Sequence, residues 1–272
     1  IIKKKINKVF FAINDPDPRS FNKSSNQLVK KGIYVKKGIL RKEIKSFYRS
    51  YLKNKKSDLP FVTCKLAISR DYYAINKKNK NITNKFSRGR VHLMRSYHDC
   101  LITSSKTIID DNPRLTCRIK GLQNRSPSRI ILDNELKIPI SSRIIKESFH
   151  FPTIIFYNKN NKAKMRLLKK LKVKIYKIPL DIHGDLDLKK SLLRAKELGY
   201  SRIFLESGIK LISNFLSKNL IDEFKLFISD TNLGNNGDAN FKKYYRLFLN
   251  EKKNIIEKVN LLGDRLLTYK LR

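Results

Sequence analysis

The sequence predicts an α/β protein with a largely parallel central sheet flanked by helices. From Pro60 onward, short apolar segments with a two-residue period alternate with amphipathic segments of helical spacing, and the connections are short. Such strands pair in parallel, because each crossover helix returns the chain to the same end of the sheet. Residues 1–59 lack this alternation and carry too little apolar material for a core of their own, so we expect two parts, 1–59 and 60–272.

The first part is expected to contain a strand, a helix, a second strand and a basic helix. The segment "VFFAINDPDP" is typical of a strand that runs into a Pro-rich turn, and Gly32 is expected to form the turn after the helix. Because the chain begins with Ile rather than Met, we expect residues 1–59 to be the tail of a domain whose front precedes this sequence.

The second part is expected to alternate strands with helices. The predicted strands cover residues 60–69, 99–105, 128–134, 153–158, 173–178, 202–207, 222–229 and 265–271. The predicted helices cover residues 84–98, 161–171, 187–199 and 208–220. The last strand, "RLLTYKL", is expected at an edge of the sheet, and the polar stretch 75–84 is expected to be a mobile loop.

The net charge of +38 comes from 61 Lys and Arg residues against 23 Asp and Glu residues. One interpretation is a polyanionic partner, either a nucleic acid or a phosphorylated ligand. The other is compositional drift, because the lysines are spread over nearly the whole length, Lys, Asn and Ile are abundant, and Trp is absent. In both cases a positively charged cleft would attract anionic small molecules.

The sequence carries no signature of a membrane, secreted or metal-binding protein. No apolar run approaches the roughly 20 residues of a membrane helix, and no signal-peptide pattern is visible, so we expect a cytoplasmic protein without a membrane partner. Cys64, Cys100 and Cys117 have no motif spacing and are expected to be reduced, and the histidines also give no metal-binding spacing. Walker, GxGxxG and GxSxG motifs are absent, so catalysis would rest on a bound cofactor and on positioning.

Three predicted strand ends carry polar residues that suit a ligand, because sheets of this kind bind ligands beyond the carboxyl ends of their strands. The first strand places Lys65, Ala67 and Ser69 on one face, with Asp71 just beyond. A cation beside two small residues is unusual for a core strand. The alternative is an edge strand with one wet face.

The strand that ends at Glu206 leads directly into a helix that Ser207 and Gly208 open. The first amide groups of a helix have no partners within it, and the helix dipole favours anions there, so this turn suits a pyrophosphate. The alternative is an ordinary tight turn.

The segment "TSSKTIIDDNPRLTCR", residues 103–118, places a hydroxyl cluster of Thr103, Ser104, Ser105 and Thr107 at the third strand end. Asp110 or Asp111 could accept hydrogen bonds from a ribose or a carboxamide. The alternative is that Asp-Asp-Asn-Pro only forms a turn.

Four ordered blocks of the sequence resemble the bifunctional deaminase–reductase of riboflavin biosynthesis. They are "PFVTCKLAIS" with Asp71, "HLMRSYHDCLITSSKTIIDDNPRLTCR", "SRIILDN", and "IFLESGIKLISNFLSKNLIDEFKLFIS" followed by Leu233-Gly234. The segment from Thr103 to Arg118 is the most specific, because its Thr, Asp, Pro, Leu and Arg all fall in the register of the family. The resemblance covers nearly the whole chain and implies a dihydrofolate-reductase-like domain at 60–272 that uses NADPH.

The implied reaction is the reduction of 5-amino-6-(5-phosphoribosylamino)uracil to the ribitylamino product, with hydride passing from NADPH to the sugar carbon attached to nitrogen. By position, the implied cofactor-binding residues are Ala67, Asn81, Thr107, Asp111, Asn134, Gly208, Ile209, Lys210, Leu211, Ile212, Ser213 and Asn214. The implied substrate-binding residues are Asn79, Arg95, Leu115, Arg118 and Glu206. The arginines suit the phosphate of the substrate, and Lys65 and Glu206 are the expected catalytic residues.

Some positions depart from the family pattern. Tyr72 follows Asp71 where the family has Gly, and Ser207 stands where the family has the first Gly of Glu-Gly-Gly. An aromatic residue often occupies the position of Asn81, and Ser that of Asn134.

Residues 1–59 resemble the C-terminal remnant of the cytidine-deaminase-like domain of the same family. That domain holds zinc with His-x-Glu and Pro-Cys…Cys motifs, and neither is present, since Leu-Met follows His92. Zinc is therefore expected only in a missing deaminase portion, and no deaminase activity is expected from this chain.

Two further expectations concern the partner and the oligomeric state. The partner is a phosphorylated ribosylaminopyrimidine rather than a specific nucleic acid, and the chain could form a homodimer as the family often does. Two alternatives stay open: a reductase of the same fold that acts on another substrate, and a non-catalytic basic protein that binds nucleic acid.

Overall fold

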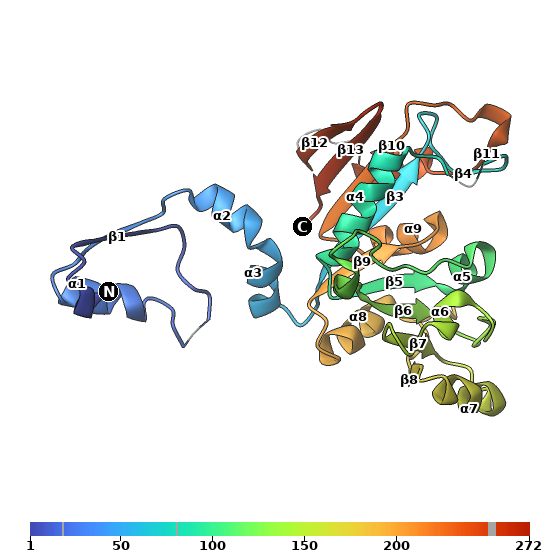
Figure 1. Ribbon diagram of the computed structural model, residues 1–272, viewed down its shortest axis with the longest axis horizontal. Helices are drawn as coiled ribbons and strands as arrows, with labels where there is room; N and C mark the ends of the chain where they lie inside the picture. Colours follow the sequence, from blue (N-terminus) through green and yellow to red (C-terminus); the bar gives the residue numbers. More distant parts are fainter. Residues whose placement is uncertain (18, 80, 250–253) are drawn as a thin grey trace. The chain divides into compact units, whose positions relative to one another are not determined.

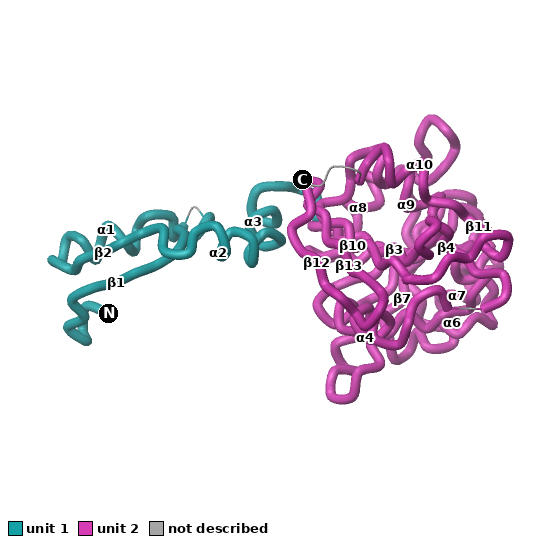
Figure 2. The backbone as a smooth tube through the Cα atoms, turned by 90° about the horizontal axis from the view of Figure 1, so that it is seen from above, with its two compact units in different colours: residues 1–60 teal, residues 61–272 magenta. Residues whose placement is uncertain are grey.

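The computed structural model describes residues 1–17, 19–79, 81–249 and 254–272. The chain divides into two compact units, Ile1–Pro60 and Phe61–Arg272 (Figure 2). This division falls within one residue of the predicted boundary. Each unit is described by itself.

The described residues of the first unit form two parallel strands and three short α-helices, after a 3-10 turn at Ile2–Lys4. Its elements are β1 (Lys8–Phe11), α1 (Lys23–Lys30), β2 (Tyr34–Lys37), α2 (Arg41–Phe47) and α3 (Arg49–Lys56). The predicted order of strand, helix and strand is confirmed, and Gly32 adopts a positive φ of 75° at the turn. The expected basic helix is two helices, because the chain turns at Tyr48.

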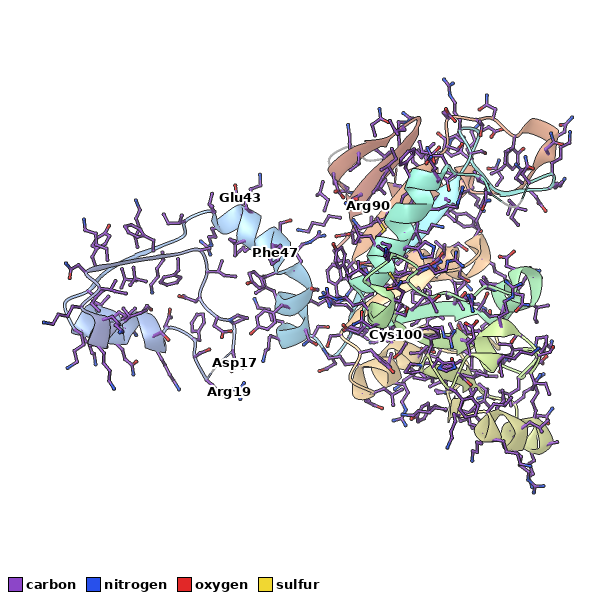
Figure 3. All side chains as sticks on the ribbon, in the orientation of Figure 1. Asp17, Arg19, Glu43, Phe47, Arg90 and Cys100 are labelled. Atoms are coloured by element: carbon purple, nitrogen blue, oxygen red, sulfur yellow. The ribbon has the colours of Figure 1, made fainter. Side chains whose placement is uncertain are left out.

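The first unit has a small apolar core and a charged clasp. Leu28 and Ile33 are its buried large apolar side chains, whereas Phe47 is 78% exposed (Figure 3). The carboxylate of Asp17 accepts hydrogen bonds from Arg19 at 2.7 Å and from Lys55 of α3 at 2.9 Å. These contacts hold the loop after β1 to a helix in a unit that buries little apolar surface.

The second unit is built on a nine-stranded sheet (Figure 1). Its order is β12-β13-β10-β3-β9-β5-β6-β7-β8, and every neighbouring pair from β10 to β8 is parallel. The bounds are β3 (Phe61–Ile68), β5 (Cys100–Ser104), β6 (Ser128–Leu132), β7 (Thr153–Tyr157), β8 (Lys174–Lys177), β9 (Arg202–Glu206), β10 (Glu223–Ile228), β12 (Ile255–Leu261) and β13 (Asp264–Lys270). The predicted class, α/β with a largely parallel central sheet, is confirmed.

Helices connect these strands. They are α4 (Lys85–Ser96), α5 (Ser105–Asp111), α6 (Arg143–Lys146), α7 (Lys162–Lys170), α8 (Leu188–Glu197), α9 (Ile209–Ser217) and α10 (Lys242–Tyr244). The Asn84 side chain caps α4 by accepting from the backbone amides of Phe86 and Ser87. Gly199, at a φ of 93°, ends the helix that precedes β9, as predicted.

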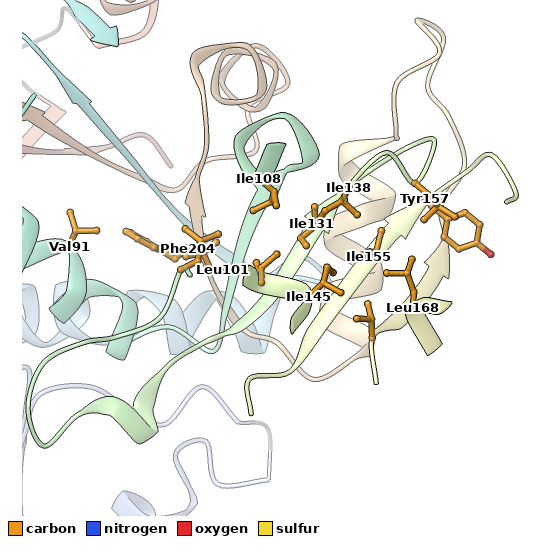
Figure 4. Packing of buried hydrophobic residues seen from close by; sticks show 14 of the residues in the cluster. Val91, Leu101, Ile108, Ile131, Ile138, Ile145, Ile155, Tyr157, Leu168 and Phe204 are labelled. Atoms are coloured by element: carbon orange, nitrogen blue, oxygen red, sulfur yellow. The ribbon is translucent and has the colours of Figure 1, made fainter. Parts of the chain in front are cut away.

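The core lies around the middle strands of the sheet (Figure 4). All five residues of β7 are buried, as are four of the five residues of β5 and of β6. Strands that are covered on both faces are apolar throughout instead of alternating, which explains the continuous runs "RIIL" and "TIIFY". The same strands direct their carboxyl ends toward one edge of the sheet.

Two predictions about sheet edges are wrong. The segment "RLLTYKL" forms β13, which lies inside the sheet between β10 and β12. The missed strand β12 joins it through Leu262 and Gly263, whose φ angles of 55° and 102° give the turn a twist that suits a hairpin. The edge-strand alternative for β3 is also wrong, because β3 pairs with β10 on one side and β9 on the other.

A second, two-stranded sheet was not predicted. It pairs β4 (Tyr73–Asn76) with β11 (Gly237–Asn240) in antiparallel fashion. The first residues of the polar stretch 75–84 therefore belong to a strand, and its last residue caps α4. Mobility of the stretch stays a prediction.

Candidate functional site at the carboxyl edge of the sheet

The hydroxyl cluster after β5 and the turn after β9 come together at the carboxyl edge of the sheet. The side-chain oxygens of Ser104, Thr107 and Ser207 form a triangle with sides of 3.0, 3.1 and 3.1 Å. Ser104 also accepts from the backbone amide of Thr107 and so caps α5. Thr103, which was expected to join this cluster, is fully buried within β5, so its hydroxyl does not reach the edge.

The amino end of α9 opens at the same place. Gly208 is its N-cap residue, and no side chain of the described residues caps this end. The φ of Gly208 is −72°, and a Cβ built there would meet no heavy atom within 4 Å. Neither backbone strain nor packing against the described residues explains this glycine. The open helix end, which favours negative charge, fits the pyrophosphate of a dinucleotide.

The predicted cofactor-binding residues in the first turns of α9 differ in how exposed their side chains are. Ile212 is fully buried, and Ser213 is 6% exposed with its hydroxyl bonded to the carbonyl oxygen of Lys210. The side chain of Lys210 is exposed, and those of Ile209, Leu211 and Asn214 are half-buried. Ile212 therefore offers no side chain to a ligand, and its backbone amide already donates to the carbonyl oxygen of Gly208 at 3.2 Å.

Glu206, Arg95 and Lys65 form a charged cluster beside this turn. Arg95 donates from Nε to Oε2 of Glu206 at 3.0 Å and from Nη2 to Oε1 at 2.9 Å. The Nζ of Lys65 lies 3.9 Å from the same carboxylate. The exposed fractions of these side chains are 16% for Glu206, 10% for Arg95 and 18% for Lys65. The three residues come from β9, α4 and β3, so the fold assembles the cluster from segments far apart in sequence.

The cluster shifts the pKa values of Glu206 and Lys65. Burial alone would raise the pKa of Glu206, but Arg95 and Lys65 outweigh it and lower that pKa to about 2. Burial lowers the pKa of Lys65, with Arg95 adding to the effect and Glu206 opposing it. Glu206 is thus a fixed anion, whereas Lys65 gives up its proton more readily than a surface lysine.

A charged row continues from this cluster across the sheet. Glu257, Thr268, Lys225, Lys65 and Glu206 are direct cross-strand neighbours on five successive strands and therefore share one face. Lys225 binds Glu223 at 2.8 Å and the hydroxyl of Thr268 at 3.2 Å, and Thr268 donates to Glu257 at 2.7 Å.

Helix α4 crosses this row (Figures 1 and 3). Its Arg90, in the middle of the helix, lies 3.7 Å from Glu257, and its Arg95, in the last turn, pairs with Glu206, so the two ends of the row contact two different turns of the helix. We call these five strand residues the charged row.

The loop after α5 carries two predicted substrate-binding residues. It begins at Asn112, whose φ of 44° is left-handed, and Leu115 has a φ of 56° although it is 4% exposed. A buried leucine in this conformation is strained, and the surrounding structure must hold it. The carbonyl oxygen of Thr116 does so in part, since it accepts from Nη1 of Arg95 at 3.0 Å.

Beyond this point the loop exposes Arg118, whose guanidinium Nη2 lies 3.1 Å from Nε2 of His92. Arg129, fully buried on β6, supports the start of the loop by donating to the carbonyl oxygen of Arg114 at 3.0 Å.

The adjacent acids at the end of α5 have different surroundings. Asp110 pairs with Lys106 one helical turn earlier at 2.9 Å. Asp111 is exposed and is the last residue of the helix, next to Asn112. Asp111 lies one helical turn after Thr107 of the hydroxyl triangle, and its role at the cofactor stays a prediction.

The other predicted residues lie around the same edge at different depths. Ala67 is half-buried on β3 and packs against the core, and Asn134 follows β6 with a buried Oδ1 that has no described partner. Asn79 and Asn81 are exposed beyond β4. Among the described residues, no contact brings these two asparagines to the charged cluster.

Asp71 has a structural role that the sequence did not predict. Its carboxylate accepts from the hydroxyl of Ser69 at 2.5 Å and from the backbone amides of Leu233 and Gly234 at 3.1 and 2.8 Å. Tyr72 has a φ of 74°, a left-handed conformation that favours glycine. The turn therefore keeps a glycine-like backbone although a tyrosine occupies it.

One cavity lies apart from this edge. An open cavity of about 510 Å³ lies near the amino ends of β5, β6 and β9, and its lining includes His98, Ser126 and His150 but no predicted site residue. In the described ranges, no three His, Cys, Asp or Glu side chains are arranged to hold a metal ion. No helix in the described part of the chain is long and apolar enough to cross a membrane.

Comparisons with known proteins agree with this architecture. A family model described as the RibD C-terminal domain matches residues 60–260. The riboflavin biosynthesis protein RibD of Aquifex aeolicus is 28% identical over 275 residues, which covers 99% of this chain and 74% of that protein. RibD of Chlamydia muridarum is 27% identical and is matched over 98% of this chain and 72% of its own length.

Solved structures show the same fold. Acinetobacter baumannii RibD matches with a TM-score of 0.78 at 24% identity, over 100% of this chain and 74% of that one. A Thermotoga maritima diaminohydroxyphosphoribosylaminopyrimidine deaminase/5-amino-6-(5-phosphoribosylamino)uracil reductase matches with a TM-score of 0.79 at 23% identity, over 100% and 73%. The riboflavin biosynthesis reductase of Saccharomyces cerevisiae matches with a TM-score of 0.62 at 20% identity, over 85% and 100%.

Proposed function

The chain belongs to the family of RibD C-terminal domains, and from this premise we propose that it reduces 5-amino-6-(5-phosphoribosylamino)uracil to the ribitylamino product with NADPH. One observation carries the proposal. The carboxyl edge of the sheet brings an open helix end, a hydroxyl triangle and a buried charged cluster to one place. The Thermotoga maritima protein of similar fold bears the name of this reductase.

The residues at this edge fit a phosphorylated dinucleotide. The amide groups at the start of α9 and the space at Gly208 suit the pyrophosphate, and the hydroxyls of Thr107 and Ser207 suit polar groups beside it. Asp111 would accept hydrogen bonds from neutral donors, and the buried Oδ1 of Asn134, which has no partner among the described residues, would do the same farther along the edge. When bound there, NADPH would supply the hydride.

The charged cluster and the loop after α5 suit the substrate. Arg118 is exposed and offers a planar fork of donors to the substrate phosphate, and Leu115 offers an apolar contact to the base. Glu206 stays ionised, so it accepts hydrogen bonds from sugar hydroxyls and does not donate a proton. Lys65, with its lowered pKa, would be the proton donor closest to the ribosyl chain.

We assign the first unit to the C-terminal remnant of a cytidine-deaminase-like domain. Two RibD relatives align with 98–99% of this chain, which includes most of residues 1–59. The zinc-binding motifs of that domain are absent from this sequence, so we propose no deaminase activity for this chain. A cytoplasmic location and a homodimer stay predictions.

Absorbance at 340 nm tests the reductase proposal. Protein, NADPH and the deaminated ribosylaminopyrimidine phosphate should lose absorbance faster than a blank without substrate, whereas a panel of pterins should not. A protein that binds NADPH but turns over pterins only would indicate a reductase of the same fold with another substrate. No turnover of any substrate would reject the proposal.

A further inference from the structure

We propose that His92 is a positioning residue that holds the guanidinium of Arg118 ready for the anionic group of the substrate. This inference rests on the proposed function for the identity of the substrate. His92 lies on α4 between the buried charged cluster and the loop after α5. Its Nε2 lies 3.1 Å from Nη2 of Arg118, and its Nδ1 lies 3.0 Å from the carbonyl oxygen of Thr116.

The two short contacts require one tautomer of the ring. A carbonyl oxygen only accepts, so Nδ1 must carry the hydrogen that points at Thr116. A guanidinium only donates, so Nε2 must present its lone pair to Arg118. The neutral ring with hydrogen on Nδ1 satisfies both contacts, and the ring then links the loop backbone to the side chain that the loop exposes.

The other two states of the ring fail at these contacts. Hydrogen on Nε2 would set two donors against each other 3.1 Å apart, and the lone pair of Nδ1 would face a carbonyl oxygen. An imidazolium would keep the first conflict and add a positive charge beside Arg118 and Arg95, with Glu206 as the nearby anion. Two longer contacts oppose hydrogen on Nδ1, because the backbone amide of Arg118 donates toward Nδ1 at 3.3 Å and the donor Nη1 of Arg95 lies 3.4 Å away; the assignment of the tautomer rests on the two shorter contacts.

Arg118 gains from this support because it is exposed. An exposed arginine samples many rotamers, and ordering it on a ligand lowers the affinity. A guanidinium that already rests on His92 loses less freedom, and its other N–H groups remain directed away from the ring. The same ring and Arg95 both bond to Thr116, so α4 sets the position of the loop and of its arginine together.

A double-mutant cycle tests this role. The variants are His92→Phe, His92→Gln, Arg118→Ala and the double variant of His92→Phe with Arg118→Ala, and the binding probe is ribose 5-phosphate. We expect His92→Phe to weaken the binding of ribose 5-phosphate and to raise the KM of the pyrimidine phosphate by about threefold to tenfold, the effect of losing one typical hydrogen bond. The kcat and the KM for NADPH should not change.

The other variants distinguish positioning from general support. His92→Gln should keep near wild-type affinity, because its amide oxygen can accept from Arg118. In the Arg118→Ala background, His92→Phe should have no further effect on ribose 5-phosphate. His150→Phe, which alters an exposed histidine at the amino edge, is the matched control and should change nothing.

Nitrogen-15 NMR of the unliganded protein gives a readout that needs no turnover. The ring of His92 should be neutral at pH 7.5 with its hydrogen on Nδ1. An imidazolium, hydrogen on Nε2, or additive effects in the cycle would overturn the proposal. If wild type turns over the pyrimidine phosphate and His92→Phe has the same KM, the positioning role fails and the reductase stands. If the cycle and the NMR agree but no variant or wild type turns over, the reductase fails and the role of His92 stands.

Discussion

Replacing Glu206 by Gln is expected to destabilise the second unit by roughly 3 kcal/mol at neutral pH. The carboxylate is the shared partner of Arg95 and Lys65, and all three side chains are largely buried. A glutamine keeps the shape but turns one acceptor oxygen into a donor that faces the Arg95 fork. Removing one partner from a buried ion pair typically costs about 3–5 kcal/mol, since the remaining charges lie uncompensated.

The lowered pKa gives a second route to this magnitude. A folded-state pKa of about 2, against 4.5 for a free glutamate, differs by about 2.5 pH units, and at about 1.36 kcal/mol each this gives roughly 3 kcal/mol. Because the folded pKa lies below the unfolded one, this stabilisation is fully present above about pH 4.5. It is lost progressively as the pH falls toward 2. The difference between wild type and Glu206→Gln should therefore shrink below about pH 4.5.

Urea unfolding at several pH values between 7 and 3.5 measures this difference. Glu197→Gln is the matched control, because Glu197 pairs with Arg194 on the surface of α8 and its side chain is 62% exposed. An exposed pair of this kind typically contributes about 0.2–1 kcal/mol. Equal unfolding midpoints for wild type and Glu206→Gln, or a difference that does not depend on pH, would refute the reasoning.

Three further predictions concern the cofactor, the substrate and a buried histidine. Gly208→Ala should change the free energy of unfolding by no more than about 0.5 kcal/mol, since the φ of Gly208 suits any residue and no described atom lies near the new Cβ. The same variant should raise the KM for NADPH on the order of tenfold. An unchanged KM for NADPH would refute the proposed pyrophosphate site at the start of α9. Asp111→Asn should raise the KM for NADPH, whereas Arg118→Ala should raise that of the pyrimidine phosphate about tenfold to a hundredfold; wild-type kinetics in both would reject the residue assignment. Burial lowers the pKa of His98 to about 4, below its unfolded value of 6.5, so His98 should reduce the free energy of unfolding by roughly 3 kcal/mol as the pH falls from 6.5 to 4. In urea unfolding, His98→Phe should make the free energy of unfolding depend less on pH in this range. An unchanged pH dependence would contradict this prediction.

The strands of the core could be predicted because their surroundings are simple. A strand covered on both faces is apolar at every position, and the run Thr153–Tyr157 shows this directly. The pairing of strands could not be predicted from the same pattern. β13 has the composition of an edge strand, and its internal place depends on a hairpin whose turn uses Leu262 instead of a typical turn residue.

The candidate site also contains residues that the sequence predicted and one that it did not. Arg95, Glu206 and Lys65 were expected at one ligand, and the fold does bring them within hydrogen-bond or ion-pair distance. His92 was not expected, because its contacts to Thr116 and Arg118 depend on how a loop folds back onto α4. Hydropathy and residue spacing do not predict how this loop folds. A histidine one helical turn before Arg95 was the available signal.

The charged row links the C-terminal hairpin of β12 and β13 to the candidate site, although no proposed ligand-contacting residue lies on the hairpin. Glu257 and Thr268 lie on the last two strands, where Thr268 donates to Glu257, and Glu257 in turn lies 3.7 Å from Arg90 in the middle of the helix that carries Arg95. Removing the residues after β10 would keep every proposed ligand-contacting residue in the chain, but it would remove Glu257, the partner of Arg90 on the helix that carries Arg95. Such a shortened protein would be a poor guide to the enzyme, and changes that accumulate near the C-terminus can tune activity from a distance.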